Sequence, residues 1–220
     1  MSWESTALYY RVINEETKRR VGGLHSARIV LLSLDFQEVE TLQDQGDWAA
    51  AADLLADAAR RVEAAGADIL LICTNTMHKV ADEVAAAISI PLLHLADATA
   101  GRIVEGGIST VGLLGTRFTM EHGFYKGRLK KHGIHVLTPP AADRELIHRV
   151  IYQELCLGVT RTESRAEFVR IMADLVQRGA RAIVAGCTEI GMLVNEEHVD
   201  VMLLDTTRIH AEQAVAFALE

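Results

Sequence analysis

Two cysteines stand in matching sequence contexts that suit acid–base chemistry. Cys73 lies in ICTNTMHK and Cys187 lies in AGCTEIGM, and each follows an apolar run and precedes a stretch with helical character. A thiol at the start of a helix meets backbone N–H groups and the positive end of the helix dipole, which favour thiolate over thiol. The pair therefore predicts a site in which one cysteine removes a proton and the other returns one.

Inversion of a stereocentre in both directions requires two nearly equivalent acids, one on each side of the reacting carbon. Two identical side chains at equivalent positions of a repeat meet this requirement, whereas a cysteine with a histidine would indicate acyl transfer. A single strand-end cysteine is more often a packed core residue. Cys156 lies in the helical segment VIYQELCLG without such polar neighbours, and we interpret it as core packing. The matched pair favours the functional interpretation for Cys73 and Cys187.

Short polar side chains surround both cysteines and could hold a substrate carboxylate. Thr116, which ends another apolar run, could donate a hydrogen bond to the same group, and Gln43 is a weaker contact candidate. His78 could orient the thiol or the substrate, or could equally lie on a helix surface. The candidate contacts next to the cysteines are Thr74, Asn75, Thr76, Thr188 and Glu189.

The elements that must position these residues alternate along the chain. Continuous apolar runs suit strands buried on both faces, and Ala-rich amphipathic stretches at residues 47–66 and 165–179 predict helices that end near Gly66 and Gly179. The pattern predicts an α/β protein with mainly parallel sheets flanked by helices. The expected strands span residues 27–35, 67–75, 90–97, 109–116, 134–139, 180–188 and 199–206.

An internal repeat relates the two halves, because GADILLICTN aligns with GARAIVAGCTE. We expect two pseudo-symmetric α/β domains, residues 1–98 plus 208–220 and residues 99–207, with the active-site cleft between them and one cysteine on each wall. The run ending at Thr116 precedes Cys187 by 71 residues, so its counterpart would end at position 2. We therefore expect the first strand of the first domain to be missing, as it would be if Met1 were an internal methionine taken as the start.

Composition excludes several classes of function. The 220 residues carry a formal charge of −8 with a pI near 5.6, which removes the electrostatic basis for binding nucleic acid. We expect no membrane span, a cytoplasmic location and reduced thiols, since the three cysteines show neither zinc spacing nor a CxxC pair. No dinucleotide or Walker motif and no persuasive lysine for pyridoxal phosphate is found, so we expect neither cofactor nor metal.

Three motifs carry a family resemblance: MSWEST at residues 1–6, CTNTMHK at residues 73–79 and GCTEIG at residues 186–191. With them the whole chain resembles the aspartate/glutamate racemase superfamily, and within it the bacterial amino acid racemases. The resemblance implies a cofactor-independent homodimer with Cys73 and Cys187 as acid and base. It also implies that the residues following each cysteine, the loop at Met1 and Ser2 and the loop at Thr116 contact an amino acid substrate.

The resemblance has one departure and leaves the substrate open. Family members usually carry a strand and a Gly-Gly turn before MSWEST, and this chain has neither. Some relatives clamp the side-chain carboxylate of an acidic substrate with a basic residue, for which Arg117, Arg144 and Arg149 are candidates. Without a clear clamp, the substrate range could be broader than aspartate and glutamate.

Two other functions remain open from the sequence. Maleate isomerases and arylmalonate decarboxylases resemble this family and also use strand-end cysteines, although decarboxylation needs only one proton donor. A catalytically weak ligand-binding protein would bind a ligand without exchanging its α-hydrogen.

Overall fold

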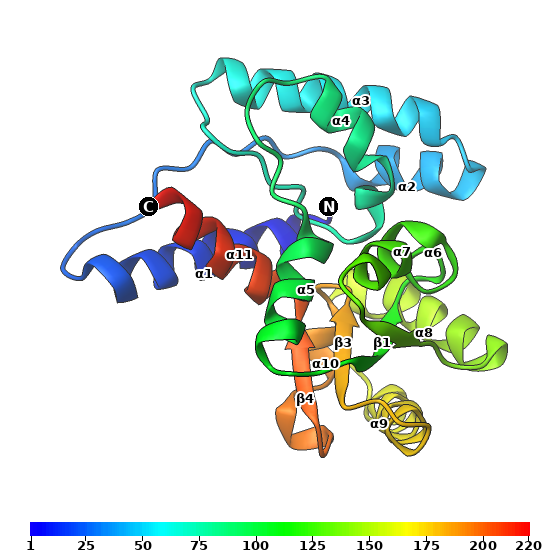
Figure 1. Cartoon of the computed structure of the whole chain (residues 1–220). Coiled ribbons are helices and arrows are strands. Elements are labelled where there is room, and N and C mark those ends of the chain that lie inside the picture. The colour runs from blue at the N-terminus through cyan, green and yellow to red at the C-terminus, as the bar shows by residue number, and fades with distance from the viewer. The chain divides into compact units, whose positions relative to one another are not determined.

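The computed structural model describes residues 1–220, which form two compact units (Figure 1). The first unit comprises Met1–His94 and His210–Glu220, and the second comprises Leu95–Ile209. The boundaries predicted from the sequence lie at 98/99 and 207/208. The chain thus leaves the first unit once and returns to it at its C-terminal helix.

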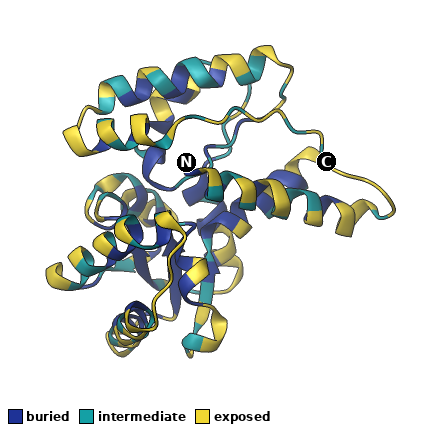
Figure 2. Cartoon of the chain, turned by 180° about the vertical axis from the view of Figure 1, so that it is seen from behind, coloured by how far each residue is buried: buried dark blue, intermediate teal, exposed yellow.

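The second unit is built on a four-stranded parallel sheet with the order β2-β1-β3-β4. Its two central strands are buried along nearly their whole length (Figure 2), as predicted from their continuous apolar sequences. All four strands form within the apolar runs expected in this half. They are β1 (Thr110–Gly115), β2 (His135–Leu137), β3 (Ala182–Gly186) and β4 (Met202–Asp205).

Helices connect these strands and supply the apolar side chains that cover the sheet. Phe168, Ile171 and Leu175 of α9 (Thr162–Gln177) are fully buried in the core that contains β1 and β3. Gly179 follows α9 with φ 104°, as expected for a glycine that ends a helix. The other helical elements are α5 (Leu95–Glu105), α6 (Arg117–Glu121), α7 (Gly123–Lys131), α8 (Ala141–Gln153), η2 (Leu155–Leu157), α10 (Ile190–Leu193) and η3 (Glu196–His198).

The last residue of β3, Gly186, sits where the sheet leaves no room for a side chain. A Cβ atom there would lie 2.8 Å from the Leu114 carbonyl oxygen and 3.0 Å from Leu113 Cδ1. We expect Gly186→Ala to lower the free energy of unfolding by about 1–3 kcal/mol, since backbone of the neighbouring strand cannot move aside cheaply. Urea unfolding measures this change.

A matched control is Gly101→Ala in the middle of α5, where an added Cβ would meet nothing within 4 Å. This substitution should raise the free energy of unfolding by up to about 1 kcal/mol, because alanine is the better helix former. Equal effects of the two substitutions would contradict the tight packing at Gly186.

The first unit is helical. Alanines on one face of α3 pack against Val80 and Val84 in a separate apolar core, which includes Val39 of α2. No helix of the chain combines the length and the apolar character needed to cross a membrane. The elements are α1 (Trp3–Val21), α2 (Phe36–Gln45), α3 (Trp48–Ala64), η1 (Thr76–Val80), α4 (Ala81–Ala86) and most of α11 (Thr206–Ala218).

The strands expected in the first unit do not form, which corrects the sequence analysis. Residues 27–35 contain no strand, residues 67–75 and 90–97 share only the parallel bridge between Leu70 and Leu92, and residues 95–97 begin α5. In the second unit β1 is a central strand that pairs with both β2 and β3. No segment of the first unit forms an equivalent central strand. Apolar segments without that neighbour have no ladder to join.

Candidate functional site

The Cys73 loop is held through its backbone carbonyl groups. The amino group of Met1 donates a hydrogen bond of 2.7 Å to the Cys73 carbonyl oxygen, and Ser5 Oγ donates a second one of 2.9 Å. Ser2 caps the N-terminus of α1 and accepts from the Ser5 N–H, so the start of this helix is ordered beside the loop. Met1 and Ser2, predicted as contact residues, therefore lie next to Cys73.

The other site residues expected in this unit also gather around the loop. Gln43 of α2 is buried and its Nε2 donates to the Met77 sulfur at 2.9 Å. Asn75 and Thr76 are buried, while Thr74 is half-buried. The structure thus brings the predicted residues of the first unit together around Cys73.

Cys187 occupies a more regular position, immediately after β3. Gly186 is paired with Gly115 across the β3–β1 ladder, so Cys187 and Thr116 directly follow two neighbouring strand ends. Thr116 is buried and caps α6 by accepting from the Thr119 N–H. This arrangement places the predicted residues of the second unit at the carboxyl edge of its sheet, where ligands of parallel sheets bind.

Polar partners surround Cys187 in the second unit. Its thiol donates a hydrogen bond of 3.0 Å to Oε2 of Glu189, a carboxylate that is only 6% exposed. Thr188 is also buried, and its hydroxyl accepts from the Thr207 hydroxyl at 3.0 Å. Cys187 therefore has a buried proton acceptor in direct contact.

The pKa values of both thiols are raised, contrary to the expectation that the helix dipole would favour thiolate. Burial raises the pKa of Cys73 to about 11, an effect that the nearby amino group of Met1 partly offsets. The pKa of Cys187 lies well above its ordinary value because of burial and, next, the Glu189 carboxylate. The helical turn after Cys73 is a short 3-10 segment, and desolvation of the thiolate outweighs its dipole.

Buried residues of α1 and α11 also lie near the Cys73 loop; from the sequence, His210 was interpreted as an ordinary polar group after a strand and Tyr9 was not considered as a site residue. His210 and Tyr9 are buried and hydrogen-bonded to each other at 2.8 Å, although they lie 201 positions apart in the sequence. Ser5 was missed as well, although it lies within the MSWEST motif. The membership of Ser5 in the MSWEST motif was the one sequence signal that could have identified it.

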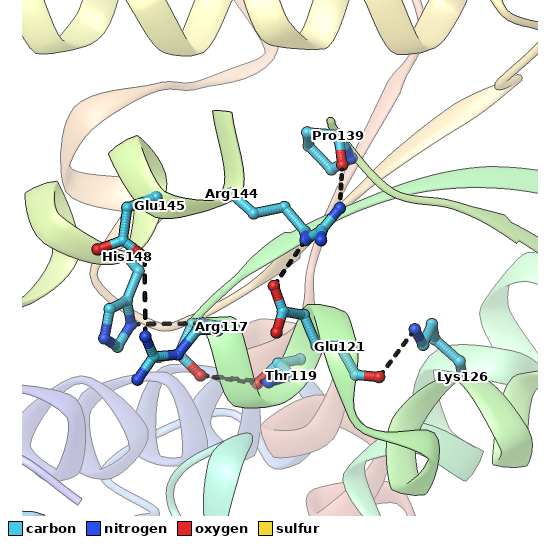
Figure 3. A network of polar contacts seen from close by, with 9 residues as sticks. Arg117, Thr119, Glu121, Lys126, Pro139, Arg144, Glu145 and His148 are labelled. Atoms are coloured by element: carbon cyan, nitrogen blue, oxygen red, sulfur yellow. Dashed lines mark hydrogen bonds and ion pairs between the residues drawn. The ribbon is translucent and has the colours of Figure 1, made fainter. Parts of the chain in front are cut away.

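Two of the three arginines considered as carboxylate clamps, Arg117 and Arg144, have other partners, as Figure 3 shows. Arg144 donates to the Glu121 carboxylate at 2.9 Å, and Arg117 lies 3.8 Å from the Glu145 carboxylate. Arg149 is exposed on α8. Two of the three candidates are thus already engaged with carboxylates of the same unit.

Comparisons with known proteins show which family model and which solved structures the chain resembles. Residues 1–214 match the family model described as Asp/Glu/hydantoin racemase. The crystal structure of a candidate Asp/Glu racemase from Yersinia pestis is 54% identical with a TM-score of 0.93, covering 100% of this chain and 96% of that one. An aspartate racemase homologue from Pyrococcus horikoshii OT3 is 30% identical with a TM-score of 0.84, covering 99% of this chain and 95% of that one.

A curated relative is more distant. The broad specificity amino-acid racemase RacX of Bacillus subtilis (strain 168) is 23% identical over 167 residues, which are 73% of this chain and 69% of that protein.

Proposed function

Because the chain belongs to the Asp/Glu/hydantoin racemase family, we propose that it is a cofactor-independent amino acid racemase that uses Cys73 and Cys187 as its two acid–base groups. The observation that carries this proposal is the recurrence of a half-buried cysteine, followed by threonine and a buried amide or carboxylate residue, in each of the two units. Each thiol serves one face of the substrate α-carbon.

Glu189 gives Cys187 a route to its reactive form. In our proposal the Cys187 thiol passes its proton to the Glu189 carboxylate, with which it is already hydrogen-bonded at 3.0 Å. The resulting thiolate takes the α-proton, and the Cys73 thiol donates its own proton to the opposite face of the carbanion. Return of a proton from Glu189 to Cys73 through solvent restores the resting state, and the reverse reaction follows the same steps backwards.

The substrate contacts proposed are the polar groups around the two thiols. Backbone N–H groups and short hydroxyls suit the α-carboxylate, which every amino acid carries. The pairing of Arg117 and Arg144 with glutamates supports a range wider than aspartate and glutamate, because neither guanidinium is reserved for a side-chain carboxylate. The proposed contact residues are Met1, Ser2, Gln43, Thr74, Asn75, Thr76, Thr116, Thr188 and Glu189.

Exchange of the α-hydrogen in deuterium oxide, followed by NMR and a chiral assay, tests the proposal. Both enantiomers of aspartate, glutamate and a panel of neutral amino acids serve as substrates. We expect exchange accompanied by inversion for at least one of them. Exchange of none would overturn the racemase assignment, and binding without exchange would favour a ligand-binding protein instead.

A further inference from the structure

The two cysteines are anchored by different means. β3 is paired with β1 and β4 and continues to Gly186, so a hydrogen-bonded ladder leads up to the residue before Cys187. In the first unit the only β-bridge joins Leu70 to Leu92, and Leu70 lies three residues before Cys73. The Cys73 loop must therefore take its position from bonds outside a sheet.

His78 supplies one of these bonds. Its Nδ1 lies 2.7 Å from the Thr74 carbonyl oxygen, and because a carbonyl can only accept, Nδ1 carries the proton. The carbonyl and the following N–H of a trans peptide point in opposite directions. The bond from His78 thus fixes the direction of the Asn75 N–H in the segment that follows Cys73.

The ring of His78 is itself held by a buried aromatic group. Its centroid lies 4.6 Å from that of His94 and 5.8 Å from that of His210, both in edge-on arrangements. His210 Nε2 donates to the Leu93 carbonyl oxygen at 2.8 Å, so its Nδ1 accepts from the Tyr9 hydroxyl. Helices α1 and α11, which lie side by side in Figure 1, therefore contribute to the surroundings of His78.

These side chains form a buried group. His78, His94, His210 and Tyr9 are each at most 6% exposed. Burial lowers the pKa of His210 to about 4, with a smaller contribution from His94. The hydrogen bond to Thr74 and the contacts with these buried rings give His78 one orientation, which a solvated histidine would lack.

We propose that His78 is a positioning residue for Cys73, and that Tyr9, His94 and His210 fix the orientation of its ring. This inference rests on the proposed racemase function. The repeat gives Cys187 no equivalent support, since the residue five positions after it is Met192, which is 44% exposed on α10. A defect at His78 should therefore affect one thiol and one enantiomer.

The activity test compares enantiomers. Cys73→Ser identifies the enantiomer whose α-hydrogen Cys73 removes. We expect His78→Ala to slow exchange of that enantiomer by about 100-fold, since a small misplacement of a reacting group has this scale of effect, and to spare the other enantiomer. His78→Asn keeps an N–H near the position of Nδ1 and should restore most of the rate, whereas His78→Gln places its amide near Nε2 and should not.

The second readout is independent of turnover. Alkylation by iodoacetamide, mapped by mass spectrometry, measures each thiol separately. In His78→Ala the released loop should expose Cys73 and accelerate its alkylation by at least about tenfold, because the thiolate is the reacting species. The rate at Cys187 should stay unchanged, and Met192→Ala should alter neither rate.

The results separate the two proposals. Equal loss of exchange for both enantiomers, equal behaviour of the Asn and Gln variants, or an unchanged Cys73 alkylation rate in His78→Ala would overturn the positioning role. If His78→Ala unfolds, all three cysteines will be alkylated rapidly. In that case the Asn and Gln variants decide, and equal behaviour of these two variants would overturn the positioning role. If the wild-type chain exchanges no amino acid, the racemase assignment fails, and the alkylation rates alone decide the role of His78.

Discussion

Cys73→Ser and Cys187→Ser are each expected to reduce racemisation by at least ~1000-fold, while each variant keeps α-hydrogen exchange of one enantiomer. A serine hydroxyl is far too weak an acid to replace a thiol in either proton transfer at neutral pH. The remaining cysteine can still remove and return a proton on its own face. The two variants should therefore retain exchange of opposite enantiomers, which NMR in deuterium oxide measures together with a chiral assay.

Cys156→Ser is the matched control. Cys156 lies in η2, is half-buried and packs against the apolar core of the second unit. Its replacement should leave both exchange and inversion near the wild-type rates. Normal racemisation by both of the other variants would show that the two-thiol mechanism is wrong.

Glu189→Gln is expected to slow racemisation by about 100-fold, because an amide keeps a contact with the thiol but cannot accept its proton. The same substitution should accelerate alkylation of Cys187. The negative charge of Glu189 raises the pKa of the Cys187 thiol, so its removal lowers that pKa and increases the thiolate fraction at a given pH. Turnover and thiol reactivity should thus change in opposite directions, as rate assays and mass-spectrometric alkylation can establish.

Glu196→Gln provides a control of the same chemistry, since Glu196 is exposed in η3. It should change neither quantity. If Glu189→Gln accelerated alkylation of Cys73 and Cys156 as well, general loosening of the fold would explain the result. A parallel fall in both turnover and Cys187 alkylation would contradict the assignment of Glu189 as the proton acceptor.

The sequence predicted the second unit well because its signals are local. The run ARAIVAGCT contains β3 and ends beside the site, and the run before Thr116 contains β1. Both strands are buried on both faces, and a continuous apolar run is typical of such strands. The neighbourhood of Thr116 and Cys187 follows from the register of these two strands.

The first unit shows what such signals cannot report. Residues 27–35 have the composition of a strand, but a strand exists only where a neighbour accepts and donates its backbone hydrogen bonds. The contact between Tyr9 and His210 depends on the tertiary packing of α1 against α11, which the hydrophobic periodicity of the sequence does not indicate. The direction of the pKa shift of the two cysteines was mispredicted because the dipole of a following helix is visible in sequence, whereas the desolvation of a thiol is not.

The order in which the units can be completed follows from their connectivity. Leu95–Ile209 is one continuous stretch, so all of the second unit has been synthesised before the chain reaches His210. The first unit is discontinuous and needs the C-terminal part of α11 to supply the imidazole that packs against Tyr9 and His78. During synthesis from the N-terminus, Cys187 can therefore acquire its final surroundings earlier than Cys73, although Cys73 leaves the ribosome first.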